Sequence, residues 1–125
     1  MDTLGLVWSV CVTAASLSEA EGAKRIFAQA RATMHRLKRV WCDAGFENRI
    51  EDWTRENCPW TVEIVKRSEG SKGWELLPKR WIVERTLGWL GRCRGLAREY
   101  DYLPETTAAK IHLAMTRLML RRLTA

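Results

Sequence analysis

After Ser18, apolar residues recur at intervals of three and four positions. They are Ala23, Ile26, Phe27, Ala30 and Met34. This spacing places them on one face of a helix, and the sequence Ser-Glu-Ala-Glu at 18–21 is typical of a capping box. We therefore predict a helix from the residue after Ser18 to about Met34.

Shorter runs rich in β-branched and aromatic residues predict strands at 6–13, 40–42, 60–66 and, as a returning strand, 74–77. The connections are predicted as a loop at 43–46, a short helix at 50–56 and a turn at 68–73. Residues 2–6 are predicted as a turn, which would join the strand at 6–13 to a strand before it. The sequence contains no such strand, so we expect the chain to be a fragment.

Prolines mark the starts of two further predicted helices. Pro78 precedes a long helix expected from 79 to about 99, and Pro104 opens a last helix from about 105 to 123. The long helix would contain Gly88, Gly91 and Gly95, each about 1 kcal/mol less favourable than Ala. Such glycines suggest close packing against another backbone or a nucleic-acid strand. The order of elements is typical of an α/β domain with a mixed sheet.

Composition narrows the class of protein. With 125 residues, 46% hydrophobic and 29% charged, the chain has the make-up of one small globular domain. The uncharged stretch 3–18 lacks a basic start and is too short to span a bilayer, so we expect a cytoplasmic protein without membrane contact. The four cysteines form no CxxC pair and lie far from both histidines in the sequence, which favours free thiols over a zinc site.

The formal net charge of +6 lies entirely in residues 79–125, since residues 1–78 carry equal numbers of basic and acidic side chains. This asymmetry predicts a polyanionic partner, with nucleic acid the first choice and an acidic membrane surface the second. The basic residues of the segment 79–98 are Lys79, Arg80, Arg85, Arg92, Arg94 and Arg98. Because a solvated helix face usually mixes both signs, we predict that this basic face contacts phosphates.

Two acidic residues are candidates for catalysis. Asp43 follows the strand at 40–42, and open α/β sheets bind ligands at the carboxyl ends of their strands. Glu84 is the single acid among residues 79–98, and helical spacing places Arg80, Glu84, Gly88 and Arg92 on one face. Position alone equally allows Asp43 to be a turn residue that caps the next helix, and Glu84 to be ion-paired with Arg80 or Arg85.

Six sequence blocks occur in the order found in insertion-sequence transposases of the DDE class, and the chain resembles the C-terminal part of such a transposase. They are DTLGL at 2–6, CDAGF at 42–46, EIVKR at 63–67, LPKRWIVERT at 77–86, GWLGR at 88–92 and AMTRLMLRRL at 114–123. The block Pro-x-Arg-Trp-x-Val-Glu-Arg-Thr is the most specific of them. The resemblance implies a truncated RNase H-like α/β fold with a mixed sheet and long C-terminal helices.

By this resemblance Asp43 matches the second catalytic acid, Glu84 the third, and Arg80 a DNA-contacting arginine. The family's acids hold Mg²⁺ or Mn²⁺, so Asp43 and Glu84 are the implied metal ligands. Lys79, Arg85, Arg92 and Arg94 complete the expected DNA-binding set. The chain departs from the wider pattern at four positions. This chain has Leu77 where the family has Tyr, and Gly91 where the family has Lys. It has Ala44 and Phe46 where the family has Gly and Tyr.

The family's first catalytic acid has no match, because Asp2 fits the turn residue of a hairpin. We therefore expect residues 1–125 to form one partial catalytic domain that lacks the first strand and any N-terminal DNA-binding region. The implied parent reaction is cleavage and joining of DNA strands by two-metal phosphoryl transfer, with little or no activity of this chain alone. The alternative is a non-catalytic DNA-binding or oligomerisation remnant. The implied partners are transposon-end DNA and either a second copy or a complementary transposase fragment.

Overall fold

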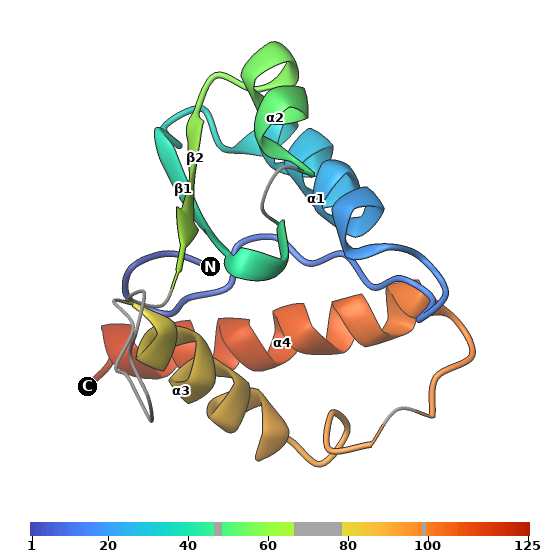
Figure 1. Cartoon of the computed structure of the whole chain (residues 1–125). Coiled ribbons are helices and arrows are strands. Elements are labelled where there is room, and N and C mark those ends of the chain that lie inside the picture. The colour runs from blue at the N-terminus through green and yellow to red at the C-terminus, as the bar shows by residue number, and fades with distance from the viewer. Residues whose placement is uncertain (47–48, 67–78, 99) are drawn as a thin grey trace, which may run out of the picture. The chain divides into compact units, whose positions relative to one another are not determined.

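A computed structural model describes residues 1–46, 49–66, 79–98 and 100–125. The elements in chain order are α1 (Glu19–Thr33), β1 (Arg39–Asp43), the 3₁₀ helix η1 (Ala44–Phe46), α2 (Glu51–Asn57), β2 (Thr61–Val65), α3 (Arg80–Gly91) and α4 (Pro104–Leu123) (Figure 1). The chain divides into two compact units. We call Thr13–Pro78 the strand unit, and Met1–Val12 with Lys79–Ala125 the helical unit. The turn predicted at 68–73, the strand at 74–77 and Pro78 lie outside the described residues.

Helix α1 of the strand unit matches its prediction closely. The Ser18 hydroxyl accepts a hydrogen bond from the Glu21 amide at 3.3 Å, which satisfies one of the free donors at the helix start. The helix ends at Thr33, with Met34 as its C-cap residue. Helix α2 also confirms its prediction to within one residue, and its N-cap residue Ile50 is fully buried.

The two described strands form a parallel pair, with Arg39 opposite Thr61 and Asp43 opposite Val65. Both strands were predicted. Of the expected mixed sheet, the described residues show this parallel pair. Helices α1 and α2 lie on one side of it (Figure 1). Because side chains alternate along a strand, the opposite side carries exposed residues, Asp43 among them.

The core of the strand unit lies between this sheet and its two helices. Phe27, Ala30, Ile50 and Trp60 are buried there, and partly buried side chains of both strands pack against them. The rings of Phe27 and Trp60 meet edge to face with their centroids 5.9 Å apart, a favoured aromatic geometry. Burial of these apolar side chains is the main force that holds α1 and α2 against the sheet.

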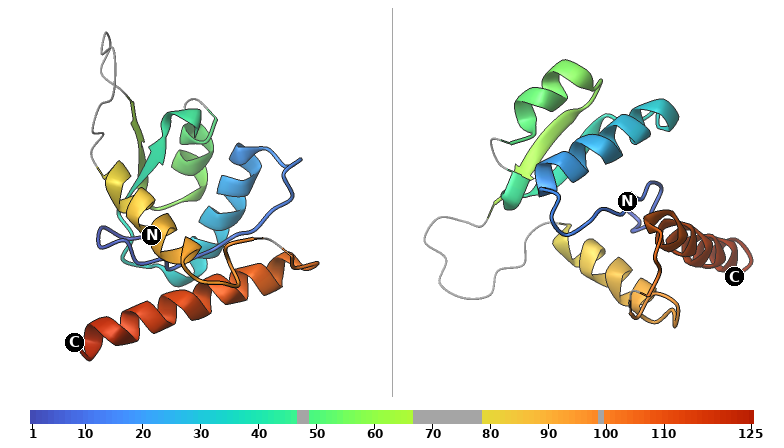
Figure 2. Two further views of the ribbon diagram at one scale, coloured as in Figure 1. Left: turned by 90° about the horizontal axis from the view of Figure 1, so that it is seen from below. Right: turned by 90° about the vertical axis from the view of Figure 1, so that its right-hand side faces the viewer.

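In the helical unit, α3 and α4 pack against each other (Figures 1 and 2). Ile82 and Thr86 of α3 and Met115 of α4 are buried. The last predicted helix is confirmed, and it begins at Pro104, whose fixed φ suits a first helical turn. All four cysteines are free.

The predicted turn at residues 2–6 is confirmed. The Gly5 amide donates to the Asp2 carbonyl oxygen at 3.1 Å, and Gly5 has a φ of +80°, which glycine adopts most readily. The Asp2 carboxylate accepts from the amides of Leu4 and Leu6 and from the Trp8 indole, each at 2.9 Å. Burial alone would raise the pKa of Asp2, but these hydrogen bonds outweigh it and lower the pKa. Asp2 therefore serves the turn.

Three predicted elements differ from the structure. Residues 6–13 form no strand, because their backbone groups pair with no other strand among the described residues. The predicted loop at 43–46 contains the 3₁₀ helix η1. The long helix expected over 79–99 ends at Gly91, and turns and bends follow it to 98. Repeated glycines weaken a helix, which accounts for the early end.

The suggestion that the α3 glycines allow close packing against another backbone is also wrong for the described residues. A Cβ atom placed on Gly88 or Gly91 would have no neighbour within 4 Å there, and Gly95 lies beyond the helix end. Within the described parts of the chain, these glycines therefore weaken the helix without making a close contact to another backbone.

Candidate functional site

Asp43 is the last residue of β1, and its side chain is exposed. One carboxylate oxygen, Oδ1, accepts a hydrogen bond from the amide of Ala44 at 2.7 Å. This contact helps to begin the 3₁₀ turn η1, so the turn role that position alone allowed is part of what Asp43 does. The strand nevertheless presents the carboxylate at its carboxyl end, as predicted.

Glu84 lies on α3 with a side chain 66% exposed, and its Oε1 is 3.4 Å from Nε of Arg80. The ion pair allowed by the sequence is therefore present. Both side chains are more than half exposed, so solvent screens the attraction and the pair contributes at most about 0.5 kcal/mol. A cation or a phosphate that approaches either group can therefore displace the other at little cost.

The two acids belong to different units: Asp43 lies in the strand unit and Glu84 in the helical unit. No three His, Cys, Asp or Glu side chains gather into a possible metal site within the described ranges. Exposed carboxylates provide the oxygen donors that Mg²⁺ and Mn²⁺ prefer, so Asp43 and Glu84 suit such an ion in kind. Their roles as metal ligands and catalytic acids remain predictions.

Arg85 makes three contacts within the helical unit. Its guanidinium carbon lies 4.5 Å from the ring centroid of Trp81 and 4.7 Å from that of Trp89, so the two indoles enclose the charge. Its Nη2 donates to the Leu4 carbonyl oxygen at 2.9 Å. Nε is buried and has no hydrogen-bond partner in the described parts of the chain. These contacts give Arg85 a role in the fold, and its predicted role in DNA binding stays a prediction.

A second arginine extends the same stack. The Arg122 guanidinium of α4 lies 4.8 Å from the ring centroid of Trp89, on α3. The alternation Trp81, Arg85, Trp89, Arg122 therefore links the two helices. The sequence contained a signal for the part of this stack that lies on α3. Trp81, Arg85 and Trp89 are spaced by four, so they share one helix face.

The other predicted DNA-binding residues do not share a single helix face. Lys79 is the N-cap of α3 with a φ of 66°, and Arg80 opens the helix. Arg92 is the C-cap, and Arg94 lies in the turns that follow. All four side chains are exposed. They thus flank the two ends of α3, because the helix is shorter than predicted.

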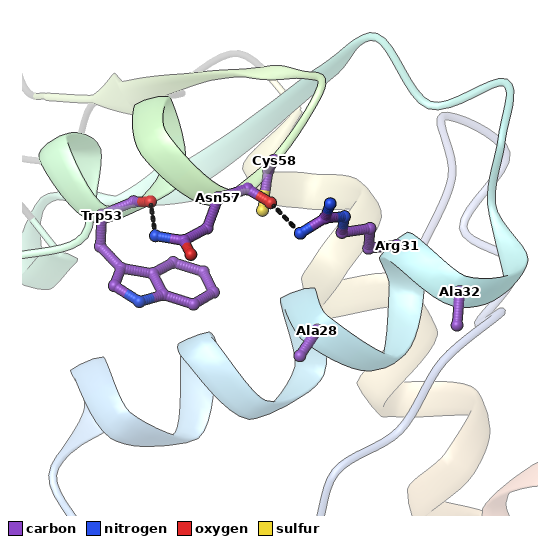
Figure 3. Close-up of a pocket in the computed structure, with 6 residues that line it drawn as sticks. All are labelled: Ala28, Arg31, Ala32, Trp53, Asn57 and Cys58. Carbon is purple, nitrogen blue, oxygen red and sulfur yellow. Dashed lines mark hydrogen bonds between the residues drawn. The ribbon is translucent and has the colours of Figure 1, made fainter.

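A pocket of about 420 Å³ lies in the strand unit between α1 and the end of α2 (Figure 3). Its lining residues are Ala28, Arg31, Ala32, Trp53, Asn57 and Cys58. Arg31 Nη1 donates to the Asn57 carbonyl oxygen at 2.9 Å across its edge, as Figure 3 shows. None of the predicted site residues lines this pocket.

Comparison with known protein families identifies the class. The family model described as the transposase DDE domain matches residues 1–119, nearly the whole chain. The protein therefore belongs to the DDE transposase family, and its function is related to transposition. Searches of curated proteins and of solved structures found no match. Among the described residues, no helix combines the length and apolar character needed to cross a membrane.

Proposed function

We propose that this chain is part of an RNase H-like transposase catalytic domain, in which Asp43 and Glu84 are two of three metal-binding carboxylates. The observation that carries the proposal is the family match, since it includes both acids in blocks that resemble the family's catalytic segments. The position of Asp43 at the carboxyl end of a parallel strand supports its part in a ligand site.

The chemistry required of these residues is simple. A bound divalent ion activates an attacking oxygen and stabilises the leaving oxygen of a phosphodiester. Asp43 and Glu84 present their carboxylate oxygens at exposed positions, where such an ion can reach them. Arg80 lies beside Glu84 and can exchange its ion pair for a DNA phosphate when the carboxylate takes up a cation.

We propose, as the resemblance implies, that the family's first catalytic acid has no counterpart in this chain. We therefore propose that Asp43 and Glu84 bind one ion weakly and that the chain alone has little or no strand-cleavage activity. Purified chain should leave supercoiled plasmid intact in MgCl₂ or MnCl₂. Robust nicking that Asp43→Asn abolishes would overturn the proposed inactivity and would still support the role of Asp43.

Metal binding is tested by titration with MnCl₂, with free Mn²⁺ followed by electron paramagnetic resonance. Asp43→Asn and Glu84→Gln should each weaken binding, while Asp52→Asn and Glu105→Gln, which remove exposed helical carboxylates elsewhere, should not. If the two acids share one ion, the double variant loses little more than either single variant. Independent losses that add, or no loss in either variant, would contradict the shared site.

DNA binding is the second part of the proposal, in which the contacts to phosphates come from Lys79, Arg80, Arg85, Arg92 and Arg94. The logarithm of the affinity for duplex DNA should fall linearly with the logarithm of salt concentration, by about one unit of slope for each phosphate contacted. Arg92→Gln with Arg94→Gln should lower that slope, while Arg49→Gln with Arg55→Gln, which removes two exposed arginines of the strand unit, serves as the charge-matched control. Salt-dependent binding that Mn²⁺ leaves unchanged would favour the alternative, a non-catalytic DNA-binding protein.

A further inference from the structure

The two residues that follow Glu84 both reach back to the turn at residues 2–6. Thr86 is fully buried, and its hydroxyl donates to the Gly5 carbonyl oxygen at 2.8 Å. Arg85 donates to the neighbouring carbonyl oxygen of Leu4 at 2.9 Å. Two consecutive carbonyl groups of the turn are thus bound by two consecutive residues of α3.

The turn fits closely against the helix at this point. A Cβ atom on Gly5 would lie 2.6 Å from the Thr86 hydroxyl oxygen and 3.2 Å from Ile82 Cγ2, so side chains of α3 fill the space beside the glycine. The Asp2 carboxylate fixes the turn from within by its hydrogen bonds to the amides of Leu4 and Leu6. The turn is therefore held in one conformation by its own hydrogen bonds and packs closely against α3.

Helix α3 also contacts α4. Trp89 stacks on the Arg85 guanidinium and on that of Arg122, which ties the second half of α3 to the last helix. Glu84 precedes the braced pair Arg85 and Thr86 and keeps its own side chain in solvent. The helix is therefore held through its buried residues, while the carboxylate stays available.

We propose that the turn Asp2–Leu6 positions Glu84 for metal binding, with Thr86 and Arg85 as the positioning residues. The inference rests on the proposed function, in which Glu84 is a metal ligand. Supporting groups behind a ligand matter because the donor oxygen must be held close to its productive position, and their loss commonly weakens metal binding by about 10-fold or more.

The test compares variants of the full chain in the MnCl₂ titration. Thr86→Val keeps the side-chain shape but removes the donor, and it should weaken Mn²⁺ binding by about 10-fold. Thr86→Ser retains a hydroxyl and should bind as the wild type does. Thr107→Val is the control, because it removes another buried hydroxyl of the helical unit, on α4. Unchanged binding in Thr86→Val, or equal weakening in Thr107→Val, would overturn the positioning role.

A second measurement keeps the inference separate from the proposed function. Amide hydrogen exchange should accelerate along α3 in Thr86→Val more than along α4, and Arg85→Lys should act in the same direction. If Glu84→Gln binds Mn²⁺ as the wild type does, the proposed function fails, and a response of α3 exchange to Thr86→Val would still support the turn as its brace. Unaltered exchange in both Thr86→Val and Arg85→Lys would refute the brace itself.

Discussion

Replacement of Gly5 by alanine should destabilise the helical unit for two separable reasons. Gly5 has a φ of +80°, a conformation that costs an alanine about 1–2 kcal/mol. The added Cβ would also lie 2.6 Å from the Thr86 hydroxyl oxygen, so this group must move. The hydrogen bond from Thr86 to the Gly5 carbonyl is then weakened, at a cost of about 1 kcal/mol. Together we expect a loss of about 2–3 kcal/mol in the free energy of unfolding.

The two contributions can be separated in a double-mutant cycle with Thr86→Ala. When the hydroxyl is absent, Gly5→Ala should cost only the backbone strain, so the coupling free energy should be about 1 kcal/mol. Urea unfolding followed by tryptophan fluorescence gives each free energy, since Trp81 and Trp89 lie on α3.

Gly88→Ala is the matched control. It lies inside α3, where a Cβ would meet no neighbour within 4 Å in the described structure, so the substitution should stabilise the protein by about 0.8 kcal/mol. A Gly5→Ala variant as stable as the wild type, or one with the same cost in both backgrounds of the cycle, would refute the reasoning from the turn geometry.

Four further outcomes are expected. Burial, with a smaller effect of the Glu51 charge, raises the pKa of the Cys42 thiol from 9.0 to about 11, so iodoacetamide at pH 8 should label Cys42 far faster in unfolded than in folded protein, as mass spectrometry of its peptide will show. The same shift makes folding stability fall as the pH rises from 9 towards 11, because only the unfolded chain then readily loses this proton. The Lys110 ammonium lies 2.7 and 2.6 Å from the two carboxylate oxygens of Asp101, and this ion pair ties the segment before α4 to that helix. Lys110→Met should lower the free energy of unfolding by about 1 kcal/mol and speed proteolysis within 92–103. Resistance to protease equal to that of the wild type would show that the ion pair does not hold this segment. Phe27→Ala removes a buried ring and its edge contact with Trp60, and should cost about 3–5 kcal/mol in urea unfolding, whereas exposed Gln29→Ala should cost little.

Elements with local signals were predictable from the sequence. The apolar spacing after Ser18 and its capping hydroxyl predicted α1, and Pro104 predicted the start of α4. The strands β1 and β2 followed from short β-branched runs, and with them the position of Asp43 at a strand end. The blocks around Asp43 and Glu84 also identified the family that the comparison confirmed. In each case neighbouring residues along the chain carry the determining interactions.

Other features depended on contacts between residues far apart in the sequence. Residues 6–13 have the composition of a strand, but a strand needs a partner for its backbone groups, and composition does not supply one. The basic segment 79–98 was predicted to lie on one long helix, but α3 ends at Gly91, so Arg92 and Arg94 follow the helix.

The sequence by itself determined the chemical types available: two acids in family blocks, an excess of arginine, a capping serine for α1 and a proline at the start of α4. Tertiary structure decided what several of those groups do. Arg85 contacts two indoles and donates to the Leu4 carbonyl oxygen, and Thr86 donates to the carbonyl oxygen of a glycine 81 positions away. The charge of a side chain is set by its own residue type. Its partner depends on which distant segments pack beside it, because buried polar groups in a folded protein are generally hydrogen-bonded.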